Sequence, residues 1–256
     1  MIRLTTLGTG TVAPVPERAC AGHLVEAGTV RLLLDCGPGI FRRIAELRVD
    51  WQTLTHIAIS HFHIDHHGDI PTLLFAWKYG TLPPRSAPLE ILGPPGTIAL
   101  FDRLAAAYGS WVTAPGFPLA IRDLPPGTAS EIGPGVLVAT TQVPHTPESV
   151  AYSIAYGRCR LVYTGDTGVS DTLGAWAHGC DVLLAECSLP RAMAIAEHLT
   201  PERCGELAAS AATRHLVLTH FYPPVEHVDV AAAVRGAFTG PLTLAWDGWT
   251  IEIEDR

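Results

Sequence analysis

Short runs of apolar residues alternate along this chain with turn residues and with segments whose apolar positions recur at helical spacing. Residues 2–7 and 30–34 are apolar runs that lead into glycine-containing turns, so we expect strands there. Further strands are expected through residues 119–164. This alternation of short strands and helical segments predicts an α/β protein.

Turn residues bound the first expected helices. Residues 35–39 read Asp-Cys-Gly-Pro-Gly and predict a turn. After this turn, Ile40, Ile44 and Leu47 fall on one face of a helix. Another helix is expected from about residue 97 to residue 108.

Cap residues mark two more helices. Asp69 is a candidate N-cap with Pro71 in the first turn, and Gly80 closes the same helix. The apolar stripe of this helix consists of Leu73, Leu74 and Trp77. Thr200 followed by Pro201 predicts the start of the second helix, whose inward-facing residues are Leu207, Ala208 and Ala211.

Two segments of the chain have counterparts later in the sequence. Residues 56–62 match residues 215–221 in residue type, and each segment is an apolar run that ends in a hydroxyl residue, a histidine and a phenylalanine. Residues 30–34 similarly resemble residues 159–163. The order of these similarities favours two β-rich halves that pack as face-to-face sheets, with helices outside and a site along one edge.

Composition sets the frame for these elements. The 256 residues suit one large domain or two small ones, and a hydrophobic content of 48% provides a substantial core. No apolar stretch is long enough to span a membrane, no cleavable leader is evident, and the six cysteines form no Cys-x-x-Cys pair. We therefore expect a cytoplasmic protein with reduced thiols. The net charge of −8 argues against a broad nucleic-acid surface.

The segment 61–66, His-Phe-His-Ile-Asp-His, concentrates four groups able to bind a transition metal directly after an apolar run. These groups are His61, His63, Asp65 and His66. Imidazole and carboxylate suit zinc and its neighbours, and the spacing lets several ligands converge on one point. A solvated histidine-rich loop is the alternative interpretation.

Three later residues extend this cluster. His145, Asp166 and His220 each stand at the end of a strand-like run, beside a small residue or a proline. Singly, each is more readily explained as a hydrogen-bonded structural residue. Together with the cluster they make too many ligands for one tetrahedral zinc, and they suit two metals that share a bridging carboxylate.

In this order, His-x-His-x-Asp-His, a lone His, Gly-Asp-Thr and Thr-His resemble the metallo-β-lactamase superfamily from residue 9 to residue 248. Residues 8–10, 92–97 and 197–200 are similar to the ribonuclease Z and arylsulfatase-like branch. The resemblance implies one domain over residues 1–256, an αββα four-layer sandwich with the metal site at one edge of its two sheets.

The resemblance also implies a ligand set for two divalent metal ions, zinc in most members, with manganese or iron as alternatives. The first metal is held by His61, His63 and His145, the second by Asp65, His66 and His220, and Asp166 bridges them.

Two metals lower the pKa of a shared water and stabilise charge on the substrate. In this chemistry Asp65 orients or deprotonates the water. His198 stabilises the transition state or protonates the leaving oxygen, and Glu197 is the candidate that holds its ring. The alternative for His198 is a histidine at a helix end without catalytic duty.

The chain departs from the tRNA-processing enzymes of this branch. Residues 14–19 lack the Lys and Asn of the family's first loop and keep only Arg18, while Pro38 and Ile40 replace an acid and a hydroxyl. The long arm that grips tRNA is missing. With the negative charge, these departures predict a small-molecule ester as substrate, and nucleic acid is not expected as a partner.

Several functions share this metal core. A phosphodiesterase is favoured because two metals and His198 suit a dianionic transition state. An aryl sulfatase or lactonase is the first alternative, and a tRNA 3′-processing endonuclease is a weaker one. An iron-dependent redox protein is the alternative from another class. A homodimer is expected only by analogy with relatives.

Overall fold

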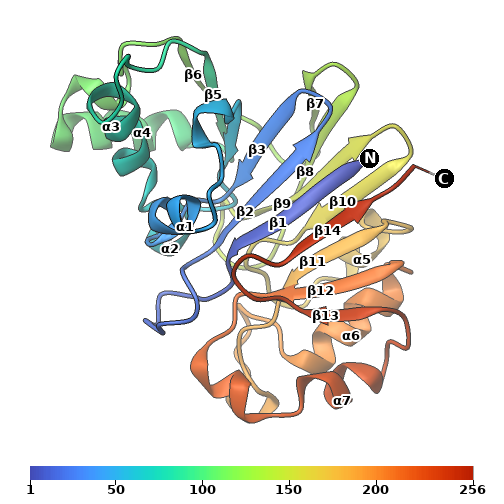
Figure 1. Cartoon of the computed structure of the whole chain (residues 1–256). Coiled ribbons are helices and arrows are strands. Elements are labelled where there is room, and N and C mark those ends of the chain that lie inside the picture. Colours follow the sequence, from blue (N-terminus) through green and yellow to red (C-terminus); the bar gives the residue numbers. More distant parts are fainter. Residues whose placement is uncertain (256) are drawn as a thin grey trace.

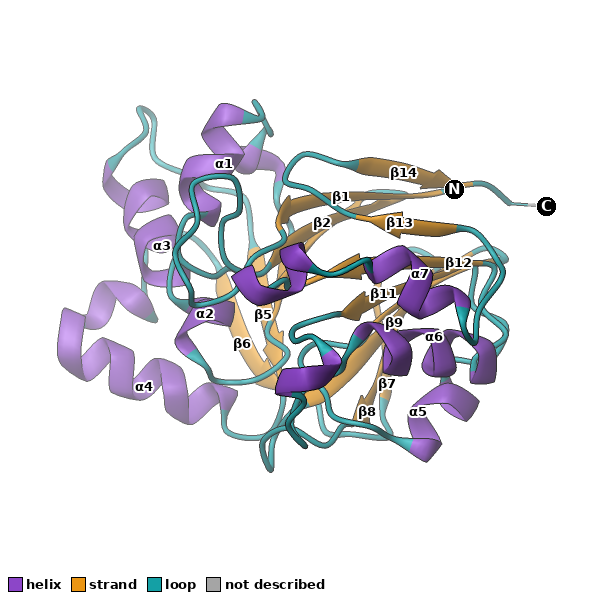
Figure 2. Ribbon diagram, turned by 90° about the horizontal axis from the view of Figure 1, so that it is seen from below, coloured by secondary structure: helices purple, strands orange, loops and turns teal. Residues whose placement is uncertain are grey.

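Two β-sheets pack face to face and carry helices on their outer faces (Figures 1 and 2). The computed structural model describes residues 1–255. The first sheet has the order β14-β1-β2-β3-β4-β5-β6 and the second β13-β12-β11-β10-β9-β8-β7. In each sheet one half is antiparallel and the other is parallel. This architecture is the predicted αββα sandwich.

The strands of the first sheet are β1 (Ile2–Gly8), β2 (Gly22–Ala27), β3 (Val30–Leu34), β4 (His56–Ala58), β5 (Leu89–Gly93), β6 (Leu119–Asp123) and β14 (Thr250–Ile253). Those of the second sheet are β7 (Ala129–Gly133), β8 (Val136–Gln142), β9 (Val150–Tyr156), β10 (Cys159–Tyr163), β11 (Val182–Glu186), β12 (His215–Thr219) and β13 (Leu242–Leu244).

Alternation along the strands builds three apolar layers. In β3, Leu32 and Leu34 join the core between the sheets, while Leu33 joins the layer beneath the helices of the first sheet. In β10, Leu161 joins the core between the two sheets, and Val162 joins the layer beneath the helices of the second sheet. Strands buried on both faces read as continuous apolar runs, which is why the sequence predicted them well.

The helices divide between the two sheets. Those that accompany the first sheet are α1 (Ile40–Glu46), α2 (Ile64–His67), α3 (Ile70–Tyr79) and α4 (Thr97–Tyr108). Those of the second are α5 (Asp171–Trp176), α6 (Pro201–Ser210) and α7 (Val230–Arg235). Short 3₁₀ turns are η1 (Trp51–Thr53), η2 (Ser110–Val112), η3 (Arg191–Met193) and η4 (Pro223–His227). None of the helices in residues 1–255 combines the length and the apolar character that a membrane crossing needs.

The expected helices are confirmed, with two local differences. Leu47 lies past the end of α1 and is 38% exposed, so it does not continue the buried face of Ile40 and Ile44. Asp69 occupies the N-cap position of α3, but its carboxylate accepts a hydrogen bond from the backbone of Phe41 instead of capping its own helix.

One of the two internal similarities corresponds to the topology. Strands β3 and β10 each join the antiparallel half of their sheet to the parallel half, as the similarity of residues 30–34 and 159–163 suggests. Strands β4 and β12 are not equivalent, because β4 adjoins β3 whereas β11 separates β12 from β10. What the two strands share is that each leads into a histidine of the predicted ligand set, His61 after β4 and His220 after β12.

Candidate metal centre

All seven predicted ligands meet at one edge of the sandwich. His61 lies three residues after the end of β4, and α2 then carries Asp65 and His66. From the second sheet, His145 follows β8, Asp166 follows β10 and His220 follows β12. The carboxyl ends of parallel strands lie at the same edge of a sheet, so residues distant in sequence come together there.

The first group is His61, His63 and His145, whose ligand atoms all lie within 4.8 Å of one another. His61 is fully buried, whereas His63 is exposed at the mouth of the site. The Nε2 atom of His145 lies 3.0 Å from Nδ1 of His63. Three imidazoles at this spacing match the donor set of a zinc ion.

The second group is Asp65, His66 and His220, again with ligand atoms within 4.8 Å of one another. The Oδ2 atom of Asp65 lies 3.6 Å from Nε2 of His220 and 3.9 Å from Nε2 of His66. All three side chains are buried. One carboxylate and two imidazoles can hold a second divalent ion.

Asp166 lies between the two groups. Its Oδ2 atom is 3.9 Å from Nε2 of His61 and 3.8 Å from Nε2 of His145. Its Oδ1 atom is 3.4 Å from Nε2 of His220, and Oδ2 is also 3.3 Å from Nε2 of His66. The carboxylate of Asp166 thus lies within 3.9 Å of histidines from both groups, as a bridging ligand must.

Four atoms of this cluster are buried without a hydrogen-bond partner among the described residues: Nε2 of His61, His66 and His220, and Oδ1 of Asp166. Leaving a buried polar group without a partner costs about 1–3 kcal/mol. The four atoms belong to groups that face one another, so cations between them would satisfy all four. The residues therefore fit two bound metal ions.

Asp35, which the sequence analysis did not assign to the site, supports the cluster from behind. Its carboxylate accepts hydrogen bonds from the backbone and hydroxyl of Ser60, from Nδ1 of His66 and from the hydroxyl of Tyr163. Contacts of this kind fix the orientation of a ligand ring and leave its other nitrogen directed at the metal. The sequence feature that could have identified Asp35 is its position directly after a buried strand.

His198 lies beside the cluster, and Glu186 holds it. Nδ1 of His198 is 2.9 Å from Oε1 of Glu186, and the other oxygen of Glu186 accepts from the Ser188 hydroxyl. The prediction that Glu197 holds this ring is wrong, because its backbone carbonyl instead accepts from Nδ1 of His145. The signal for Glu186 was an acid at the end of the apolar strand β11.

The charges in the site follow from burial and from the facing groups. Burial acts to raise the pKa of Asp166, but the charges of His220 and His66 hold it well below its usual value. The pKa of Asp65 is about 2, because a hydrogen bond from His220 outweighs the opposing effect of burial. For His198, burial lowers the pKa but the hydrogen bond to Glu186 raises it above the ordinary value. These shifts favour the ionised form of both acids and the protonated form of His198.

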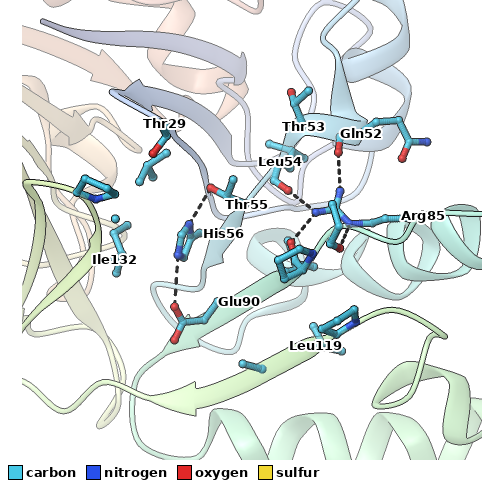
Figure 3. Close-up of a pocket in the computed structure, with 18 residues that line it drawn as sticks. Thr29, Gln52, Thr53, Leu54, Thr55, His56, Arg85, Glu90, Leu119 and Ile132 are labelled. Atoms are coloured by element: carbon cyan, nitrogen blue, oxygen red, sulfur yellow. Dashed lines mark hydrogen bonds and ion pairs between the residues drawn. The ribbon is translucent and has the colours of Figure 1, made fainter.

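A separate pocket of about 780 Å³ lies at the other ends of the parallel strands, where His56 begins β4 (Figure 3). Nε2 of His56 is 3.3 Å from Glu90, and Arg85 donates to the backbone carbonyls of Gln52 and Leu54. The polar side chains of this pocket thus have partners within the protein. None of the seven predicted ligands lines the pocket. The chemistry is therefore placed at the histidine cluster.

Comparisons with known proteins agree with this geometry. A family model described as the beta-lactamase superfamily domain matches residues 30–221. A protein named ribonuclease Z from Mycobacterium sp. (strain KMS) is 31% identical over 99% of this chain and 96% of its own length. Among solved structures, the metallo-beta-lactamase fold protein YhfI from Bacillus subtilis has a TM-score of 0.86 at 24% identity, covering 98% of both chains. The short form of human tRNase Z (ELAC1) has a TM-score of 0.80 at 23% identity, covering 99% of this chain and 100% of its own.

These relatives bear on one expectation of the sequence analysis. Likeness to a ribonuclease Z over nearly the whole chain does not support the expectation that nucleic acid is excluded as a partner. The expected homodimer and the cytoplasmic location stay predictions. With the family model covering most of the chain and the candidate metal ligands gathered at the sandwich edge, the chain belongs to the metallo-β-lactamase superfamily, as a hydrolase homologous to ribonuclease Z.

Proposed function

We propose that this chain hydrolyses phosphodiester bonds at a site for two divalent metal ions. The observation that carries the proposal is the position of Asp166, whose carboxylate lies within 3.9 Å of histidines from both groups of three ligands. Two metals at such a site activate water and neutralise the charge that develops on phosphoryl oxygens. The ligands we assign are His61, His63, Asp65, His66, His145, Asp166 and His220.

The chain's own residues divide the proton transfers. Asp65 is ionised because the pKa of its carboxyl is about 2, so it can accept a hydrogen bond from the attacking water and orient it. The hydrogen bond of His198 to Glu186 favours its protonated form, and its ring lies close to the rings of His145 and His220, with centroid distances of 4.9 and 5.8 Å. It is the group we assign to protonate the leaving oxygen.

Zinc is the metal we assign, with manganese or iron as alternatives. The proposed ligands offer imidazole nitrogens and carboxylate oxygens and no thiolate, a set that these ions share. Metal analysis of the purified protein decides among them. Two zinc or manganese ions per chain support the hydrolase, whereas one iron per chain favours a redox function.

The substrate we propose is a small-molecule phosphodiester. The first loop, residues 14–19, offers Arg18 as its only cation, and that side chain is already paired with Glu226 at 2.8 Å. An RNA phosphodiester is the second candidate, and it is supported by the likeness to a ribonuclease Z over 99% of the chain.

Hydrolysis of bis(4-nitrophenyl) phosphate by the zinc- and manganese-loaded protein tests the proposal. An aryl sulfate, a lactone and a precursor tRNA are assayed beside it, together with the Asp166→Ala and His198→Ala variants. We expect cleavage of the diester, its loss in Asp166→Ala and a lower turnover in His198→Ala. Cleavage of the sulfate or the lactone alone would contradict the substrate class, and cleavage of precursor tRNA alone would favour the second candidate.

A further inference from the structure

Two pockets contain residues of the site, one of them Asp65 and the other His198, and no residue lines both pockets. The first, of about 620 Å³, contains Asp65 together with Ile64 and the loop 11–16, so we name it the Asp65 pocket. The second, of about 440 Å³, contains His198 together with Val169 and residues 194–195, so we name it the His198 pocket. Each pocket thus includes one of the two residues to which we assign proton transfers.

The Asp65 pocket presents mainly apolar surface. Val12 and Ile64 are 56% and 58% exposed, and Pro14, Val15 and Pro16 extend the same wall. The arginines of the pocket are engaged by acids, since Arg18 pairs with Glu226, Arg43 with Asp247, and Arg42 with Glu46. An exposed apolar wall beside a polar centre suits an aromatic group better than a charged one.

The His198 pocket is smaller and has balanced charge. Val169 and Ile195, which are 56% and 50% exposed, form its apolar part. Arg203 pairs with Glu206, and the remaining charges in the lining are Arg191 and Glu202, which are opposite in sign. This pocket is placed to receive whatever is bonded to the oxygen that His198 protonates.

We propose that the leaving group of the substrate occupies the His198 pocket and that the ester group retained on phosphorus occupies the Asp65 pocket, where an aromatic group fits. This assignment rests on the proposed function. Water, oriented by Asp65, forms a new P–O bond and releases one proton to solvent, while the P–O bond to the leaving group breaks. The leaving oxygen takes the proton of His198, which regains one from solvent, and the products are an alcohol or phenol and a phosphate monoester.

Two diesters with the same leaving group test the assignment. Methyl 4-nitrophenyl phosphate has a small retained group and 1-naphthyl 4-nitrophenyl phosphate has an aromatic one, and release of 4-nitrophenolate is followed for both. The ratio of their kcat/KM values reports on the pocket for the retained group. Matched variants fill one pocket each, Ala13→Trp in the Asp65 pocket and Ala194→Trp in the His198 pocket, and Ala106→Trp on the outer helix α4 is the control.

We expect Ala13→Trp to lower the naphthyl-to-methyl ratio by about tenfold, the scale of a lost aromatic contact in a pocket. Ala194→Trp should lower kcat/KM for both diesters by the same factor and leave the ratio unchanged, and Ala106→Trp should change neither. Calorimetric binding of 1-naphthyl phosphate, the product that retains the aromatic group, should weaken in Ala13→Trp only. Thermal unfolding of each variant verifies that it is folded.

The opposite pattern overturns the assignment. If Ala194→Trp lowers the ratio and Ala13→Trp does not, the pockets are used in reverse, and if neither changes the ratio, the pockets do not hold these groups. If the unmodified protein releases 4-nitrophenolate from neither diester, the proposed function fails and the assignment fails with it.

Discussion

The carboxylate of Asp35 lies 2.8 Å from Nδ1 of His66, at the end of β3 and behind the metal centre. The same oxygen accepts a hydrogen bond of 2.7 Å from Tyr163, the last residue of β10 in the opposite sheet. Asp35 therefore sets the orientation of one ligand ring from a position shared by both sheets.

Replacing this carboxylate should weaken metal binding. Asp35→Asn keeps the size of the side chain but removes the charge that the His66 ring faces, so we expect metal affinity to fall about 10- to 100-fold. Competition with a fluorescent chelator measures this. Asp69→Asn is the control, since Asp69 bonds the backbone of Phe41 and no ligand ring. Equal affinities for Asp35→Asn and the unmodified protein would show that Asp35 has no part in positioning His66.

Glu186 should control the pH range of activity. Its hydrogen bond raises the pKa of His198, and a proton donor loses activity as the pH rises through its pKa. In Glu186→Gln the basic limb of the pH–rate profile should therefore move to lower pH. Turnover should fall about 10²-fold, the low end of the contribution of a general acid. Glu197→Gln should leave the profile in place, and a shift of equal size in both variants would contradict the role of Glu186.

His23 should make the fold sensitive to acid. Burial, with the charges of His66 and His220, lowers the pKa of this buried histidine to about 3. Between that value and the unfolded value near 6.5 the unfolded chain binds more protons, so stability falls as the pH decreases through this range. His23→Phe should remove this loss and gain about 2 kcal/mol in free energy of unfolding at pH 5, and much less at pH 7.5.

The comparison for His23→Phe is made by denaturant unfolding after chelation, so that release of metal does not contribute. The ring of His23 lies edge-on to Tyr163 with a centroid distance of 5.1 Å, a contact that phenylalanine can keep. A constant difference between the two proteins from pH 7.5 to pH 5 would mean that His23 does not carry the acid sensitivity.

Removal of metal should destabilise the protein through the same cluster. Ligands come from both sheets, so ions that bind only the folded chain stabilise it, by about 2.7 kcal/mol at a free metal concentration of 100 Kd. We expect a chelator to lower the Tm of the unmodified protein and to have little effect on Asp166→Ala. An unchanged Tm after chelation, with metal loss verified by elemental analysis, would argue against a binuclear site in this cluster.

The sequence located the residues of the candidate cluster better than the side chains that support them, for a physical reason. His61 to His66 lie within one short segment, and each remaining ligand ends a strand whose apolar run is visible in the sequence. Asp35 and Glu186 act through hydrogen bonds to partners far away in the chain, and such pairing depends on how the strands are placed together. Their positions at strand ends were visible, but their partners were not.

Local patterns had the same limit elsewhere. Leu47 continues the apolar spacing of α1 but falls after the helix has ended, where a turn exposes it. The pairing of Glu197 with His198 rested on adjacency in sequence, whereas the two residues lie in a turn and the ring of His198 contacts Glu186, at the end of β11.

The candidate ligands lie in short segments that follow strand ends, and longer loops form much of the two pockets. Hydrogen-bonded sheets fix His61, Asp166 and His220, while the loop 11–16 and the segment 191–195 supply the surfaces that a substrate would touch. The candidate ligands are thus held by the sheets, while the loops that line the pockets can vary without moving them. Transplanting either segment from a relative with another substrate should transfer preference without rebuilding the centre, which makes this protein a suitable scaffold for redesigning hydrolase specificity.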